Sequence, residues 1–119
     1  MVGIMNQNGI IIRRGDTFDI LIHFKNKHGG DLNLEGCTIK MAVKEPKESK
    51  PIFTVNAEII SEEEGKARIK LTSKHTRLPL KDYATDIQLT LKNGDIHTVY
   101  PQNINQVGVF RITEDVTEE

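Results

Sequence analysis

The chain has 119 residues, of which 37% are apolar, and its 16 basic and 17 acidic residues leave a net charge of −1. This length suits one domain with a single core. The balanced charge and the absence of tryptophan argue against nucleic acid as a partner, because basic surface and aromatic platforms supply that affinity. No apolar run is long enough to cross a bilayer, so no membrane partner is expected.

The N-terminal residues indicate where the domain begins, and the cysteine content limits the disulfides and metal sites that it can contain. Residues 1–8 have no basic segment followed by an apolar one, so they do not form a secretory signal. We expect residues 1–8 to be a disordered or vector-derived segment and residues 9–117 to form the domain. Cys37 is the single cysteine, which excludes an internal disulfide and any multi-cysteine metal site.

Alternating apolar and polar residues predict four strands in the first half of the chain. They are expected at residues 9–14, 17–26, 38–44 and 53–60. The loop at 27–36 is rich in Gly, Asn and Asp, and its Leu32 and Leu34 are expected to cover an edge of the core.

The second half of the chain repeats this pattern around one helical turn. Strands are expected at residues 65–72, 83–92, 95–100 and 107–113. Ser73 is the predicted N-cap of the turn that carries His75. Asn93-Gly94 predicts a two-residue type I′ hairpin, because both central positions of that turn need positive φ.

Seven or eight short strands with no helical periodicity between them predict a sandwich or a barrel and exclude a parallel α/β sheet. Tyr83 opens a long strand directly after a corner that begins at Leu78. A tyrosine in that position is typical of the tyrosine corner of immunoglobulin-like domains. Thr85 stands where such domains place their second cysteine. We therefore predict an all-β fold, an immunoglobulin-like antiparallel β-sandwich without a disulfide.

Arg14-Gly15-Asp16 spells the tripeptide that integrin ligands present on an exposed loop. The alternative interpretation is the end of a strand followed by a turn, for which Gly and Asp supply the geometry. Tripeptide matches are weak without structural context, so the turn is the favoured interpretation.

No group of residues predicts catalysis, a metal site or a cofactor. The histidines lack the HxH and HxxxH spacings of zinc ligands, and Cys37 has no recognisable base beside it. The acidic residues nearest to loops lack the spacing of calcium loops. The residues weighed in this way are His23, His28, His75, His97, Cys37, Asp16, Asp31 and Asp95.

Binding through a sheet face or a sheet edge remains as a function. Leu21, Val99 and Val107 are apolar residues on otherwise polar faces, and they are the candidate contact surface. The other binding class is a carbohydrate- or cell-surface-binding sandwich. That class needs an exposed aromatic platform, and Tyr100 is the one aromatic residue expected near a loop.

From about Ile12 to Thr117 the chain resembles a phage family, the immunoglobulin-like N-terminal domain of baseplate upper proteins and related small phage structural proteins. The residues that carry the resemblance are mostly turn and core positions. They are Arg14-Gly15-Asp16-Thr17, 31–38, 65–72, Thr76, Leu78, Tyr83, 86–88, Gly94, Thr98 and 108–117.

The resemblance implies a virion component of the tail or baseplate, made in the host cytoplasm, with no catalytic residues. Its implied partners are other virion proteins, and a homo-oligomer in the assembly is expected. Baseplate upper proteins continue into a linker and further domains, whereas this sequence ends at Glu119. A truncated form and a small stand-alone structural protein are both compatible with that difference.

Overall fold

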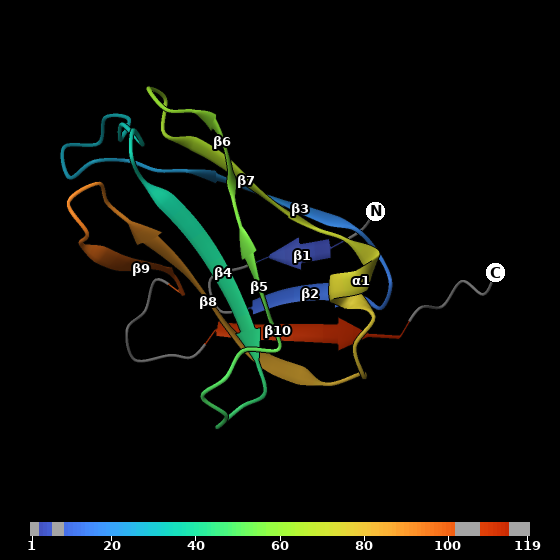
Figure 1. Ribbon diagram of the computed structural model, residues 1–119. Coiled ribbons are helices and arrows are strands. Elements are labelled where there is room, and N and C mark those ends of the chain that lie inside the picture. The colour runs from blue at the N-terminus through green and yellow to red at the C-terminus, as the bar shows by residue number, and fades with distance from the viewer. Residues whose placement is uncertain (1–2, 6–8, 102–107, 115–119) are drawn as a thin grey trace.

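The computed structural model describes residues 3–5, 9–101 and 108–114, which form two β-sheets and one helical turn (Figure 1). The seven-stranded sheet contains β1 (Gly3–Met5), β2 (Gly9–Arg13), β4 (Thr38–Lys44), β5 (Phe53–Asn56), β8 (Asp82–Thr90), β9 (Ile96–Tyr100) and β10 (Gly108–Thr113). The three-stranded sheet contains β3 (Phe18–His23), β6 (Glu58–Ser61) and β7 (Lys66–Leu71). The helical turn α1 (Ser73–Thr76) follows β7.

The strand order is that of an immunoglobulin-like sandwich. One sheet runs β1-β2-β10-β8-β4-β5 with β9 also paired to β8, and the other runs β3-β7-β6. In immunoglobulin terms, β3, β7 and β6 take the places of strands B, E and D, while β4, β8 and β10 take those of C, F and G. The predicted all-β sandwich without a disulfide is confirmed, and Cys37 is a free thiol.

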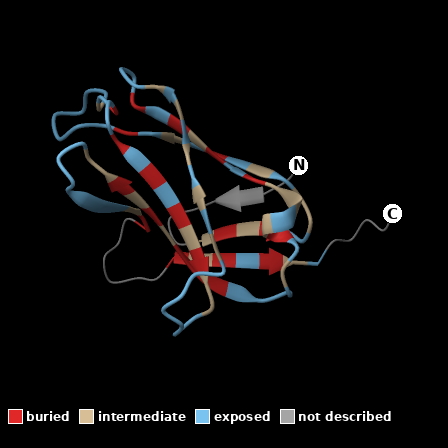
Figure 2. Ribbon diagram, viewed as in Figure 1, coloured by how far each residue is buried: buried red, intermediate tan, exposed pale blue. Residues whose placement is uncertain are grey.

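The core lies between the sheets and is built by the predicted alternation. Figure 2 shows buried and exposed positions alternating along β4. Ile39, Met41 and Val43 of that strand are at most 1% exposed. Leu34 is completely buried, so the loop before β4 closes one end of the core. Burial of such side chains contributes roughly 1.5–3 kcal/mol each, which makes this face of β4 a principal source of stability.

The described residues form ten strands where seven or eight were predicted, and two local features explain the difference. β1 pairs antiparallel with β2, although we expected residues 1–8 to be disordered or vector-derived. The predicted strand 53–60 divides at Ala57, where the chain leaves β4 and joins β7. The Ala57 N–H still donates to Ile39 O at 2.8 Å. Period-two alternation continues through the crossing, which is why the sequence alone did not indicate it.

The predicted type I′ turn at Asn93-Gly94 is wrong, although the hairpin itself is present. Gly94 has a φ of 95°, and Asn93 does not have positive φ. The Gly94 N–H donates to Leu91 O at 2.8 Å, and the Leu91 N–H donates to Asp95 O at 2.8 Å. This is a three-residue loop in which a type I turn is followed by a left-handed glycine. The Asn93 side chain accepts the Asp95 N–H at 2.9 Å, which favours the wider loop.

The corner before β8 is closed by Tyr83. Tyr83 is 2% exposed, and its hydroxyl donates to Pro79 O at 2.7 Å, the contact that defines a tyrosine corner. Leu78 is half-buried and packs against the core. Thr85 is buried, and its hydroxyl donates to Ala42 O at 2.7 Å across the β4–β8 ladder. A hydrogen bond therefore stands where antibody domains place a disulfide cysteine.

Tyr83→Phe removes only the hydroxyl, so it tests the corner bond directly. Pro79 is exposed and water can solvate its carbonyl, so we expect a loss of about 1 kcal/mol in the free energy of unfolding. Urea denaturation measures the change. An unchanged midpoint would show that the corner bond contributes nothing to stability.

Gly65→Ala and Gly94→Ala form a matched pair, because both glycines have positive φ. A Cβ at Gly65 would lie 2.6 Å from Phe24 O and 2.7 Å from Leu32 O, whereas a Cβ at Gly94 meets nothing within 4 Å. Gly94→Ala should therefore cost about 1–2 kcal/mol from strain alone. Gly65→Ala should cost a further 1–3 kcal/mol, roughly, from overpacking. Equal losses in urea denaturation would contradict the crowding argument.

Candidate functional site

The structure does not bring the predicted contact residues together. Leu21 lies on the outer face of β3 in the three-stranded sheet and is 69% exposed. Val99 lies on β9 in the other sheet, is half-buried and packs against the core. Val107 lies outside the described residues. Leu21 and Val99 therefore do not lie in one surface patch, since they belong to opposite sheets.

The Arg14-Gly15-Asp16 segment is a tight turn held against α1. The Asp16 N–H donates to Arg13 O at 3.1 Å, and Gly15 has a φ of 87°. The Gly15 N–H donates to Thr76 O at 3.3 Å, and the Thr76 hydroxyl donates to Asp16 O at 2.7 Å. Thr76 thereby holds both sides of the turn, and Gly15 and Asp16 are only half-exposed. The geometry agrees with the structural interpretation of this tripeptide and lacks the protruding loop of an adhesive one.

The helical turn α1 begins one residue earlier than predicted. Its N-cap is Thr72 and not Ser73. The His75 Nδ1 accepts the Thr72 backbone N–H at 3.0 Å, so the imidazole takes the part that Glu or Gln plays in a capping box. The His75 ring packs against the Phe53 ring, with centroids 4.8 Å apart. His75 is therefore a structural residue that joins α1 to β5.

The electrostatics of His75 follow from this position. The pKa of His75 lies below its usual 6.5. Burial of the imidazole is the larger cause, and the positive charge of nearby Lys74 is the smaller one. Because Nδ1 accepts a hydrogen bond from an N–H, it carries no proton in this arrangement. A proton on Nδ1 would face the Thr72 N–H, which is itself a donor. This conflict disfavours the charged imidazolium, as burial does, and so also lowers the pKa of His75.

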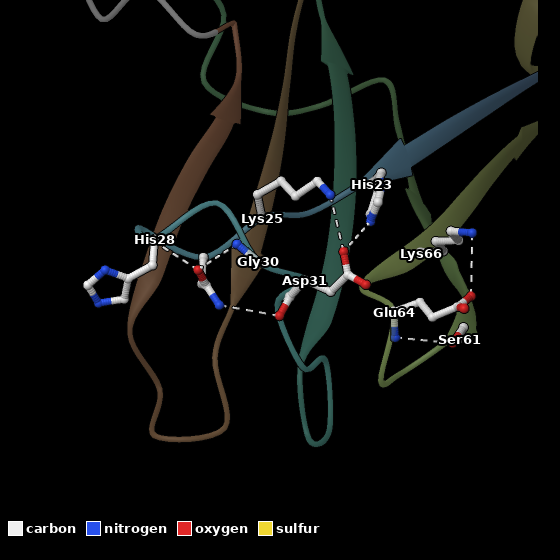
Figure 3. A network of polar contacts seen from close by, with 9 residues as sticks. His23, Lys25, His28, Gly30, Asp31, Ser61, Glu64 and Lys66 are labelled. Atoms are coloured by element: carbon white, nitrogen blue, oxygen red, sulfur yellow. Dashed lines mark hydrogen bonds and ion pairs between the residues drawn. The ribbon is translucent and has the colours of Figure 1, made fainter.

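A polar network joins the end of β3 to the loop that follows it (Figure 3). Asp31 Oδ1 accepts from Lys25 Nζ at 3.2 Å and lies 2.9 Å from His23 Nε2. Both hydrogen bonds lower the pKa of Asp31, and the bond from Lys25 has the larger effect. The Asn26 side chain accepts the N–H groups of His28 and Gly30 and shapes the same loop. The network orders an exposed loop, and ion pairs at such positions add little stability.

Neither a metal site nor a reactive thiol appears in the part of the chain that the structure describes. No group of three or more His, Cys, Asp or Glu side chains lies close enough to hold an ion in those ranges. Cys37 is 8% exposed, and its Sγ lies 3.8 Å from Glu35 O. The arrangement around Cys37 is that of a small, buried core side chain.

The outer face of the three-stranded sheet is charged but balanced. Arg68 Nη2 lies 2.6 Å from Glu58 Oε1, and this hydrogen bond raises the pKa of Arg68. Lys66 Nζ lies 3.4 Å from Glu64 Oε1. Lys66 and Arg68 of β7 are thus paired with carboxylates, and Lys70 stands opposite Asp19 in the β3–β7 register. The described part of this face therefore has no strongly basic surface for a polyanion.

A hollow of about 380 Å³ lies beside the point where the chain crosses between the sheets. Its lining combines hydroxyl, amide and ammonium groups with aliphatic side chains, and it contains no aromatic ring. The residues are Cys37, Thr38, Ile39, Lys40, Asn56, Ala57, Ile59, Gln88, Thr90 and Ile96. Tyr100 is 7% exposed and belongs to the core. The aromatic platform that a carbohydrate-binding face requires is therefore not formed by Tyr100.

Sequence reasoning missed two exposed isoleucines on the segment that includes β5 and β6. Ile52 is 42% exposed and Ile60 is 52% exposed. Both occupy the polar side of the alternation between residues 52 and 61, as Leu21 does on β3. Their place among the solvent-facing positions could have been read from the sequence, because an apolar residue on the solvent-facing side of a strand marks a candidate contact position.

Comparison with protein-family models and with curated proteins gives no match for this chain. Over the described ranges, no helix is both long and apolar enough to span a membrane.

The lowered pKa of His75 predicts an acid-sensitive contribution to stability. The folded state binds fewer protons at this site than the unfolded chain, so the contribution is present above about pH 6.5 and is lost as the pH falls toward the folded pKa. His75→Gln keeps an acceptor for the Thr72 N–H but does not titrate. Urea denaturation should show the variant losing less stability than the wild type between about pH 7.5 and about pH 5. Parallel pH profiles would contradict the assigned role.

Proposed function

We propose that this chain is a non-enzymatic structural protein of a phage virion, in the tail or baseplate, that acts through protein–protein contacts. Such proteins need a rigid domain with open sheet edges and exposed aliphatic positions, because those features pair with neighbouring chains. The observation that carries the proposal is that β5 and β6 each end a sheet of the described residues, with Ile52 and Ile60 exposed beside them. The resemblance of the sequence to baseplate upper proteins supports the virion as the setting.

The proposed partners are other virion proteins of the tail or baseplate hub, with self-association in the assembly. Synthesis in the host cytoplasm fits a sandwich whose one cysteine is buried and free. The fold supports the role through rigidity. Tyr83 of β8 bonds the corner at Pro79, Thr76 of α1 bonds the Arg-Gly-Asp turn at Asp16, and the Arg14 N–H of that turn donates to Thr113 O of β10.

The alternative proposal, a carbohydrate- or cell-surface-binding module, is supported by the polar hollow beside Asn56. The lack of an aromatic ring in its lining and the burial of Tyr100 weigh against it, because aromatic surface carries much of the contact energy at such sites. A glycan array that uses the purified protein separates the two proposals.

Mass spectrometry of gradient-purified particles from the phage or prophage that encodes the gene tests the proposed function. We expect the protein in the particle fraction at a fixed ratio to tail proteins, because a structural component has a defined copy number. The soluble lysate fraction of the same culture is the control. Abundant protein in the lysate and none in the particles would overturn the proposal.

A further inference from the structure

The polar lining of the hollow beside the sheet crossing comes from one face of the seven-stranded sheet. Figure 1 shows β5, β4, β8 and β9 side by side in that order. Ile39 and Met41 of β4 are buried, so Lys40 between them faces away from the core. Lys40 is paired with Asn56 on β5 and with Gln88 on β8, and paired residues of neighbouring strands share a face.

Two neighbouring rows of side chains therefore meet at the hollow. The first row is Asn56, Lys40 and Gln88, in which adjacent Cβ atoms lie about 4.5–5.5 Å apart. The second row pairs Thr38 with Thr90 and lies about 6.8 Å farther along the strands. All five residues line the hollow. One ammonium, two carboxamides and two hydroxyls thus stand together on this face.

The polar groups of the first row are not used within the part of the chain that the structure describes. There, the Lys40 ammonium enters no ion pair, and the Asn56 and Gln88 side chains form no hydrogen bond. No carboxylate belongs to the lining. Asp86 lies in the next row, where burial raises its pKa and the charges of Lys44 and Lys40 oppose the rise. Two ammonium groups therefore surround one carboxylate, which leaves a positive charge beside the hollow.

A single carboxylate fits this set of groups. It accepts hydrogen bonds through two oxygens, and an ammonium and the amide groups of Asn and Gln supply the matching donors. A single unpaired ammonium balances one negative charge, whereas a phosphate dianion would keep an excess. Ile96 is 61% exposed and lines the same hollow, so it offers an apolar contact for the methylene stem of an acidic side chain.

The exposure of the site favours a carboxylate that is carried by another protein. Thr38, Lys40 and Asn56 are all exposed, so the hollow is open to solvent. Free small molecules bind where most of their surface is buried, and an exposed ion pair alone contributes little. An acidic side chain on a partner protein adds its ion pair to a wider contact around the hollow, and it supplies the charge that this surface lacks.

We infer that the hollow between β5, β4, β8 and β9 receives an acidic side chain of a partner protein, held by Lys40, Asn56 and Gln88. The inference rests on the proposed protein–protein role and names its surface and the chemistry of the partner. Lys40 supplies the charge, the two carboxamides orient the carboxylate, and Ile96 contacts the stem.

A matched pair of peptides tests the chemistry. A capped tripeptide with a central glutamate and its glutamine counterpart have the same length and shape and differ in charge. Titration of the isotope-labelled protein, followed by NMR, should show at least about threefold tighter binding of the glutamate peptide, because one exposed ion pair is gained. The largest shifts should fall at Lys40, Asn56 and Gln88. Equal binding of the two peptides, or shifts confined to other residues, would overturn the inference.

Two substitutions test the residues. Lys40→Met removes the ammonium, and Lys50→Met is the matched control, because Lys50 is exposed in the loop between β4 and β5 and does not line the hollow. Asn56→Asp adds a carboxylate opposite Lys40 with little change of shape. The preference for the glutamate peptide should disappear in Lys40→Met and in Asn56→Asp and persist in Lys50→Met. Either of the first two proteins, folded by circular dichroism and with the wild-type preference, would overturn the inference.

Charge reversal in the encoding phage tests the partner. Lys40→Glu places like charges together, so purified particles should contain at least about tenfold less of this protein than of the wild type. Lys50→Glu should be incorporated normally. Normal incorporation of a folded Lys40→Glu protein would overturn the inference and leave the proposed function standing. A wild type that is absent from particles, yet prefers the glutamate peptide, would overturn the proposed function and leave the carboxylate site standing.

Discussion

The seven-stranded sheet depends on the pairing of β8, because β4 lies along one of its edges and both β9 and β10 lie along the other. Its first residues also close the tyrosine corner, and Thr85 ties it to β4 through a side-chain hydrogen bond. A disulfide would normally brace this position against the other sheet in an antibody domain. Here close packing, a buried hydroxyl and a corner bond act in its place, which suits a protein with a single cysteine.

The functional argument follows from what the surface offers. The described residues present no metal cluster, and the polar networks around Asp31 and Thr76 connect a loop to its own strand and a turn to α1. What the domain does offer is an edge strand on each sheet, β5 and β6, together with aliphatic side chains on otherwise polar faces. These are features of contact with other protein chains. They support the structural role proposed above.

Much of the fold could be predicted from the sequence, because period-two alternation and turn residues are local signals. The strand at 38–44 is predicted to the residue, and Leu34 is buried as expected. The crossing at Ala57 was missed because alternation is the same whether a strand stays in its sheet or changes sheets. The separation of Leu21 from Val99 was missed for a related reason, since alternation gives the face of a strand but not the sheet to which it belongs.

The parallel pairing of β2 with β10 has a mechanical consequence. These strands lie near the two ends of the domain, and five residue pairs join them, from Gly9 with Val109 to Arg13 with Thr113. Force applied to the two ends draws parallel neighbours in opposite directions, so it loads all of their hydrogen bonds together in shear, whereas β1 can unzip one bond at a time. A domain fixed at both ends within a larger particle therefore resists stretching through this one ladder.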